Sequence, residues 1–236
     1  MTLGHRVAVA LVVLLALARG THAGSPEDAI LPLDHYKSDK ARALAAAYAA
    51  QLTQIYDNVY HCLPWLQIGK HGLGFRRPRG IDRDNHYLSI WVWVDQISNP
   101  EFAAMPPARR ASAMFSRYGV DLLRRLSRHA PFASEPRAAG YAVVLSWLKP
   151  DGVVRPTAPA VAETLAVFAD TATVDGFLAL TVTPAQLADR ALVASFDGKS
   201  ELGRLALEIW DDPFTATFKL KDYTPDPAHR CEGRPG

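Results

Sequence analysis

The residues with the clearest potential for chemistry are charged groups that directly follow hydrophobic runs. Asp95 follows WVWV, Lys149 follows LSWL and Asp170 follows VFA. If these runs are parallel strands, their ends meet at one edge of a sheet, where open α/β sheets place their sites. The three side chains would then act as base, electrophile and charged partner in an enzyme of unknown reaction. Because Asp is also common in turns and helix caps, a structural role is the favoured interpretation.

Aromatic side chains form a second candidate site, because they recur at alternate positions of two strand-like segments. In the segment YLSIWVWVD, Tyr87, Trp91 and Trp93 share one side of a strand and aliphatic residues occupy the other. The segment YAVVLSWL adds Trp147. The candidate ligand-binding residues are therefore Tyr87, Trp91, Trp93 and Trp147. The favoured alternative is a core role, in which an N-terminal helix covers the aromatic side and buries at least one of Trp91 and Trp93.

A row of arginines is the third candidate site, on a predicted helix over 107–129. Its members are Arg110, Arg117, Arg124 and Arg128, at spacings of seven, seven and four residues. This spacing places them on one side of the helix, where they could bind a lipid headgroup, a polysaccharide or an acidic protein. An Arg-rich, solvated helix face explains the same row without any partner, and it is the favoured interpretation.

Motifs for cofactors and metals do not meet their required spacings. The loop GKHGLGFRRPRG is rich in glycine and basic residues, but it follows a helix and lacks the Lys-Ser/Thr of a phosphate-binding loop. No serine lies in a G-x-S-x-G elbow. His61, His71 and His86, with Asp82 and Asp84, show no recognisable ligand spacing. We therefore expect no cofactor and no metal site.

The first 23 residues predict a secretory signal peptide. A short basic start precedes the apolar run VAVALVVLLALA, and the small-residue exit Thr21-His22-Ala23 follows it. The run is shorter than the ~20 apolar residues that a membrane-spanning helix needs, and no later segment is long and apolar enough. We expect cleavage after Ala23 and an exported, soluble chain without a transmembrane segment, located in the periplasm or outside the cell.

The charge of the expected mature chain excludes one class of partner. The full chain has 26 basic and 24 acidic residues. Removing Arg6 and Arg19 with the signal peptide leaves 24 of each. A chain near neutrality has no overall attraction for polyanions, so nucleic acid is not an expected partner.

Two cysteines remain in the expected mature chain, Cys62 and Cys231. In an oxidising compartment, an isolated pair of this kind predicts a disulfide. A catalytic cysteine beside His61 is the alternative, but neighbours on a helix point about 100° apart. We therefore predict a bridge from the end of the first helix to the C-terminal tail.

The order of the predicted elements indicates an α+β fold with a single globular domain over 24–236. A helix over 38–62 is followed by a long loop over 66–86, and then by a β-α-β unit. That unit comprises a strand over 87–95, the helix over 107–129 and a strand over 141–148. Further strands are predicted over 163–170, 191–196, 204–210 and 215–221, with a short helix that begins with a capping box at Thr183. We expect a mixed β-sheet covered by the N-terminal helix and ending in a C-terminal β-meander.

These observations favour a non-catalytic, exported domain that binds a small ligand or a partner protein of the cell envelope. Bacterial origin is inferred from the signal peptide and the Ala- and Arg-rich composition. Two alternatives remain. One is an enzyme that uses the charged groups at the strand ends. The other is a structural envelope component that is recruited through the arginine row.

Overall fold

The computed structural model describes most of the chain downstream of the expected signal peptide. The described residues are 26–63, 65–78, 84–94, 100–132, 135–148, 162–197, 200–203, 207–209, 227–229 and 231. The signal peptide over 1–23 and the predicted strand over 215–221 lie outside these ranges.

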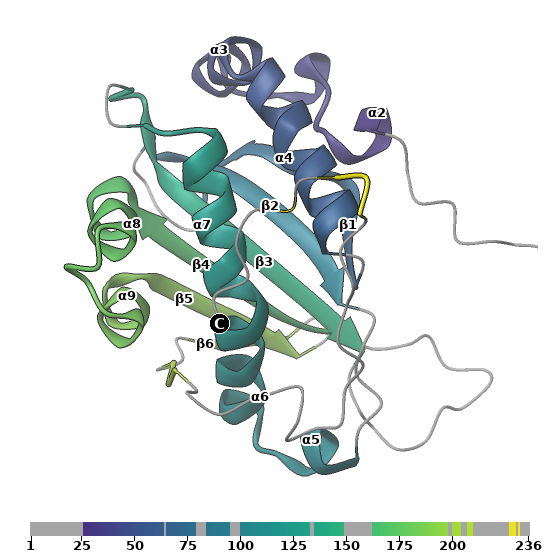
Figure 1. The fold of residues 1–236 in the computed structure, drawn as a ribbon, viewed down its shortest axis with the longest axis vertical. Helices are drawn as coiled ribbons and strands as arrows, with labels where there is room; N and C mark the ends of the chain where they lie inside the picture. Colours follow the sequence, from purple (N-terminus) through teal and green to yellow (C-terminus); the bar gives the residue numbers. More distant parts are fainter. Residues whose placement is uncertain are drawn as a thin grey trace, which may run out of the picture.

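A mixed six-stranded sheet forms the centre of the α+β fold (Figure 1). The strands are β1 (Leu66–Arg76), β2 (His86–Val94), β3 (Ala138–Leu148), β4 (Ala162–Asp170), β5 (Leu192–Asp197) and β6 (Ser200–Gly203). They lie side by side in chain order. Only β2 and β3 are parallel, and the other neighbouring pairs are antiparallel. The predicted α+β class and mixed sheet are confirmed.

The parallel pair confirms the predicted β-α-β unit. The connection from β2 to β3 contains α5 (Pro100–Ala104), α6 (Pro107–Met114), a π-helical turn η2 (Phe115–Gly119) and α7 (Val120–His129). The predicted helix over 107–129 is therefore one continuous helical segment with a π-helical turn inside it. Its apolar stripe is buried, because Phe115, Leu122 and Leu126 are all 0 % exposed.

The N-terminal segment adds four short helical elements to the same layer. They are α2 (Pro26–Ala29), the 3-10 turn η1 (Leu33–His35), α3 (Asp39–Ala47) and α4 (Ala49–Cys62). The single helix predicted over 38–62 is thus divided at Tyr48. Its predicted cap is confirmed, since the hydroxyl of Ser38 accepts a hydrogen bond from the Ala41 N–H, at 3.4 Å.

Helices α4 and α7 contact each other on one face of the sheet (Figure 1). The sequence predicts that the N-terminal helix covers the aromatic side of β2. This expectation is wrong, because both helices lie against the aliphatic side, where Leu88, Ile90 and Val92 are each 0 % exposed. The buried sides of these two amphipathic helices form a second layer of the same core, so neither helix covers the aromatic side.

The first strand was missed in the sequence, where residues 66–86 were expected to be a loop. β1 pairs with β2 along both of its halves, but a bulge interrupts the register between Ile68 and Leu73. The bulge changes which alternate positions face the core, from the even-numbered Leu66 to the odd-numbered Leu73 and Phe75. A pattern of period two is lost across such a shift, which is why the strand was not recognised.

In the C-terminal part, β5 matches the first strand of the predicted meander, and β6 follows it as an antiparallel neighbour. α8 (Thr171–Leu178) and α9 (Pro184–Arg190) separate β4 from β5. The predicted capping box is confirmed at α9, where the side chain of Thr183 and that of Gln186 each accept a hydrogen bond from the backbone N–H of the other. Of the strand predicted over 204–210, the structure describes residues 207–209, and these are not in a strand.

Candidate functional site

The sheet has a covered face and an open face. On the covered face, beneath α4 and α7, the side chains of Ile90, Val143 and Val167 are each 1 % exposed or less. On the opposite face, Trp91 is 38 % exposed and Leu148 is 48 % exposed. We call the second surface the open aromatic face and define it by Tyr87, Trp91, Trp93, Val144, Leu148, Phe168 and Phe196, all of which are at least partly exposed. Contiguous apolar side chains left in solvent typically mark an interaction surface.

Trp91 is held in one orientation at the centre of this face. Its ring lies against Gly69 of the β1 bulge, where a Cβ atom would stand only 2.4 Å from a ring carbon. Its indole Nε1–H donates a hydrogen bond of 2.9 Å to the Oγ of Ser146. A planar ring that is fixed on one side and partly exposed loses little further freedom on binding, so it is suited to anchor a contact.

A hydroxyl pair continues this contact across the next two strands. The Oγ of Ser146 on β3 lies 2.9 Å from the Oγ1 of Thr164 on β4, within hydrogen-bonding distance. Neither residue was singled out in the sequence, because isolated Ser and Thr residues in strands carry no signal of their own. The parallel register of β2 and β3 sets Ser146 beside Trp93, on the same side of the sheet as Trp91. The sequence alone does not give this register, and so it does not indicate the contact between Trp91 and Ser146.

Tyr87 and Phe168 form the other end of the open aromatic face. Their ring centroids are 5.4 Å apart in an edge-to-face arrangement. Burial raises the pKa of the Tyr87 hydroxyl above its ordinary value, and the negative charge of Asp170 raises it further. The phenol therefore stays neutral at physiological pH, and this end of the face presents an uncharged aromatic pair.

Trp147, the fourth candidate for ligand binding, lies on the covered face and is only 2 % exposed. The parallel register explains this, because Leu145 pairs with Val92, which faces the helices, and Trp147 shares the side of Leu145. Its indole Nε1–H donates to the Oε2 of Glu163, at 2.8 Å. Trp147 is thus a core residue, and its assignment to the same site as Trp91 is wrong.

Arg110 also points into the protein, contrary to its assignment to a partner-binding row. Its Nε donates to the Oε2 of Glu163 at 2.8 Å, and its Nη2 contacts the other carboxylate oxygen. Both side chains are at least 93 % buried. Arg110, Glu163 and Trp147 therefore form one buried polar cluster that ties α6 to β3 and β4. Such a pair contributes to the geometry of the core and is difficult to break, because either charge alone would be left in a medium of low polarity.

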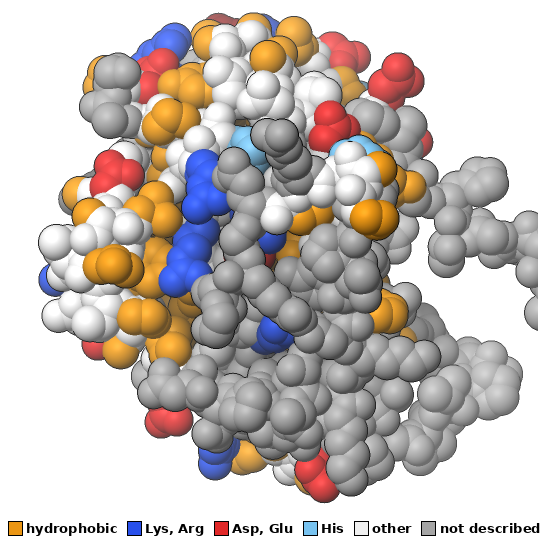
Figure 2. Space-filling model, in the orientation of Figure 1, with side chains coloured by type: hydrophobic (Ala, Val, Ile, Leu, Met, Phe, Trp, Pro, Cys, Tyr) orange, Lys and Arg blue, Asp and Glu red, His pale blue; other side chains and the backbone are white. Residues whose placement is uncertain are grey.

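The other arginines of the row lie on the outer side of the helical layer. Figure 2 shows a column of Lys and Arg side chains over α7. The guanidinium of Arg124 stands 4.9 Å from the centre of the Phe177 ring, and that of Arg117 stands 5.7 Å from the Tyr118 ring. Arg128 is exposed. The predicted row is thus reduced to Arg117, Arg124 and Arg128, and two of these pack on aromatic rings of the protein itself.

The groups expected at the strand ends do not meet at one edge. Asp170 pairs with Gly140 at the beginning of β3, because β4 is antiparallel to β3. It lies at the opposite end of the sheet from the residues at which β2 and β3 end. Its carboxylate caps α8 by accepting from the N–H and the hydroxyl of Thr173, at 2.8 and 2.9 Å. Asp95 and Lys149 lie outside the described residues.

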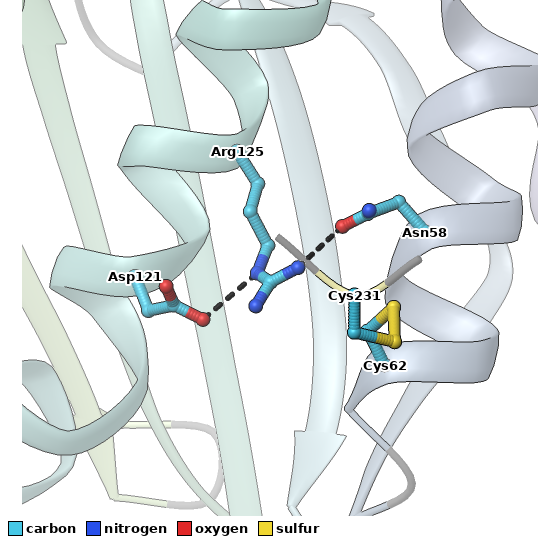
Figure 3. The surroundings of a disulfide bond; sticks show 5 residues. All are labelled: Asn58, Cys62, Asp121, Arg125 and Cys231. Atoms are coloured by element: carbon cyan, nitrogen blue, oxygen red, sulfur yellow. Dashed lines mark hydrogen bonds and ion pairs between the residues drawn. A yellow bond between two sulfur atoms is a disulfide. The ribbon is translucent and has the colours of Figure 1, made fainter. Parts of the chain in front are cut away.

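The predicted disulfide is present between Cys62 and Cys231, with a Cα–Cα distance of 5.3 Å and a sequence separation of 169 residues (Figure 3). Closing so long a loop stabilises a protein by about 4–5 kcal/mol in the chain-entropy model. Beside it, Arg125 of α7 donates to Asp121 at 2.8 Å and to the side-chain oxygen of Asn58 on α4 at 2.5 Å. Bridge and network together fix α4 against α7 on the covered face.

Three comparisons with known proteins add no relative. No family model matches the chain, and neither a curated protein nor a solved structure matches it. In the part of the chain that the structure describes, no group of three or more His, Cys, Asp or Glu side chains is placed to hold a metal ion. Within the same ranges, every helix is too short or too polar to cross a membrane.

Proposed function

We propose that the chain is an exported, non-catalytic domain that binds a partner protein through the open aromatic face. The observation that carries this proposal is the exposure of Trp91 on a sheet whose other face is closed by helices. The central part of a protein interface is typically rich in Trp, Tyr and Phe and poor in charged residues. The open aromatic face has this composition, since its defining residues include no charged side chain.

The fixed position of Trp91 supports binding over a role in internal packing. A tryptophan that packs in a core has both ring faces covered, whereas Trp91 keeps more than a third of its surface in solvent. Its hydrogen bond to Ser146 and its contact with Gly69 are local and hold the ring in place without covering it. Aromatic side chains of this kind commonly supply most of the binding energy of an interface.

The disulfide supports the exported location. Cys62 and Cys231 form a disulfide, and no free cysteine is present among the residues that the structure describes. Structural disulfides form and persist in the periplasm and outside the cell, whereas the cytosol keeps thiols reduced. We predict that the exported protein begins at Gly24. The intact mass of the secreted protein tests this prediction. Retention of residues 1–23 in that material would contradict it.

The binding surface is tested by photo-crosslinking from two exposed glutamines. Gln67 lies on the open aromatic face beside Trp93, whereas Gln54 lies on α4 on the other side of the protein. We place a photo-reactive residue at each position and irradiate cells that export the protein. We expect a crosslinked product of defined mass from position 67, because that side chain borders the proposed interface, and no such product from position 54.

A second substitution links the product to the aromatic residues. Trp91→Ala combined with the photo-reactive residue at position 67 should remove the product, since truncating an interface aromatic weakens binding by roughly thirtyfold or more. Circular dichroism of this variant confirms that it is folded. The same product from positions 54 and 67, or a product that persists in folded Trp91→Ala, would overturn the proposal.

A further inference from the structure

We propose that the partner is a second copy of this chain, which packs its open aromatic face on the same face of the first copy around a two-fold axis. This inference rests on the proposed function, because it names the partner that the open aromatic face binds. The axis runs parallel to the strands, between β2 and β3. With this axis, β2 of one copy lies opposite β3 of the second copy, and β1 lies opposite β4.

The strand register arranges the residues on this side of the sheet, exposed and buried, in rows. One row runs Arg76, Tyr87, Gly140, Asp170, and the next runs Gly74, Ser89, Ala142, Phe168. The two further rows run through Trp91, Val144, Ala166 and through Gln67, Trp93, Ser146, Thr164. A two-fold axis parallel to the strands places each row of one copy opposite the same row of the second copy. The two rows run in opposite directions across the sheets.

This reversal places large side chains opposite small ones. Tyr87 faces Gly140 of the second copy, whereas Phe168 faces Gly74, where Tyr36 of the same copy already fills the space: a Cβ there would stand 2.3 Å from the Tyr36 hydroxyl. Trp93 faces Ser146 in the same way. Gly74, Gly140 and Ser146 are buried within each copy, so the two faces would meet as broad apolar surfaces at the ~10 Å spacing of packed sheets, without insertion of large side chains into gaps.

The same reversal pairs the two charged residues that border the open aromatic face. Arg76 and Asp170 stand at opposite ends of one row, on β1 and β4. Three strand spacings of about 4.8 Å separate them within one copy, which is too far for an ion pair. In the dimer, Arg76 of each copy faces Asp170 of the other, so two ion pairs close the same end of the interface. Both side chains are exposed in the single chain, and Asp170 remains exposed although it caps α8.

The overlapping area is sufficient for a stable dimer. Four strands are about 19 Å wide at 4.8 Å each, and the nine residues of β2 extend for about 30 Å. The flat footprint is then about 570 Å² per copy, or about 1,100 Å² for the pair. Specific interfaces bury at least about 1,000 Å², and the relief of side chains increases the buried area above the flat value.

The oligomeric state of the oxidised, full mature protein tests the inference. Sedimentation equilibrium over a concentration series should show reversible association to twice the monomer mass. Trp91→Ala should weaken association by roughly thirtyfold, because Trp91 lies next to the axis. A monomer at every concentration would overturn the inference. So would a dimer with the parent's affinity in folded Trp91→Ala, because the copies would then meet through another surface.

A charge reversal tests the orientation of the two copies. Arg76→Glu should weaken the dimer, because two like-charged pairs replace two ion pairs, and Arg76→Glu with Asp170→Arg should restore it. Since Asp170→Arg removes the cap of α8, we include Asp170→Ser, which keeps a capping oxygen but not the charge and should weaken the dimer less than Arg76→Glu. An unchanged dimer in folded Arg76→Glu would overturn the two-fold arrangement.

The crosslink from position 67 separates failure of this inference from failure of the proposed function. Peptide mapping should place the crosslink at the segment around Thr164 of a second copy, because the row of Gln67 reverses onto it. A product with a different protein, formed only from position 67, would overturn the homodimer and leave the binding surface intact. Absence of any product from position 67 would count against both.

Discussion

On the covered face of the sheet, large side chains such as Leu88, Ile90 and Trp147 are buried. Trp147 illustrates this, since it is 2 % exposed and donates to Glu163. On the open aromatic face, Trp91 makes a similar hydrogen bond to Ser146 but remains 38 % exposed. The two tryptophans belong to adjacent parallel strands and differ only in the face to which the register assigns them.

This difference shows that the two faces of one sheet contribute unequally to stability. Burial of apolar area stabilises a fold in proportion to the area removed from water, so the covered face supplies most of the free energy of folding. The open aromatic face retains exposed apolar area that an isolated domain does not need. The bulge of β1 supports this separation, because Gly69 allows the ring of Trp91 to lie flat on the strand.

The largest expected effect separates the two tryptophans. Trp147→Ala should lower the free energy of unfolding by about 3–5 kcal/mol, because it opens a cavity in the core and removes a donor from Glu163. Trp91→Ala should cost only about 1–2 kcal/mol, since it removes one hydrogen bond and partial burial. Chemical denaturation of both variants measures the difference. Equal losses would show that the two faces contribute alike to stability.

A second comparison concerns two arginines of the predicted row. Arg110→Met should lower the free energy of unfolding by about 3 kcal/mol, because it leaves the carboxylate of Glu163 buried without its counterion. Arg124→Met should cost no more than about 1 kcal/mol, the value of a partly exposed cation–π contact. Denaturant midpoints of the two variants check this. An unchanged midpoint in Arg110→Met would show that the buried ion pair with Glu163 contributes little to stability.

A smaller effect is expected from the glycine beneath Trp91. Gly69→Ala should displace the ring, because its Cβ would stand 2.4 Å from a ring carbon. The displacement breaks the hydrogen bond to Ser146, so we expect a loss of about 1 kcal/mol and increased quenching of tryptophan fluorescence by acrylamide. Lys70→Ala, an exposed position in the same bulge, is the control and should leave both quantities unchanged.

The smallest effect concerns the pH dependence of stability at the beginning of β2. His86 is 3 % exposed, and burial lowers its pKa; the positive charges of Lys40 and Arg77 lower it further, while Asp84 opposes them. The unfolded chain then binds a proton more readily than the native protein below about pH 6.5, the ordinary value for histidine. Stability should therefore decrease as the pH falls from 7 to 5, with a slope below about 1.4 kcal/mol per pH unit for one proton.

His86→Gln should flatten this profile, because the amide does not titrate and fits a similar volume. The measurement is urea denaturation of the parent and the variant at several pH values between 5 and 7. A parent profile that has no slope in this range, or a variant that keeps the slope of the parent, would show that His86 is not the responsible group.

Several elements could be predicted because their signals are local. The strand that contains Trp91 and Trp93 alternates strictly, and Ser38 and Thr183 cap their helices through side chains only three residues away from their partners. The disulfide was predictable by elimination, since two cysteines admit only one bridge. β1 was missed because its bulge shifts the alternation in mid-strand.

The sequence by itself determined which residues of each strand share a side, the class of the fold and the pairing of the two cysteines. Only the tertiary structure decided which side each helix covers and which tryptophan remains exposed. Alternation places Trp91 and Trp147 relative to their own strands, but the register between β2 and β3 assigns them to opposite faces. Likewise, the spacing of Arg110 and Arg124 indicates one helix side, whereas Glu163, 53 residues beyond Arg110, draws only Arg110 into the core. Contacts between distant segments depend on packing, which the local pattern of a single sequence does not contain.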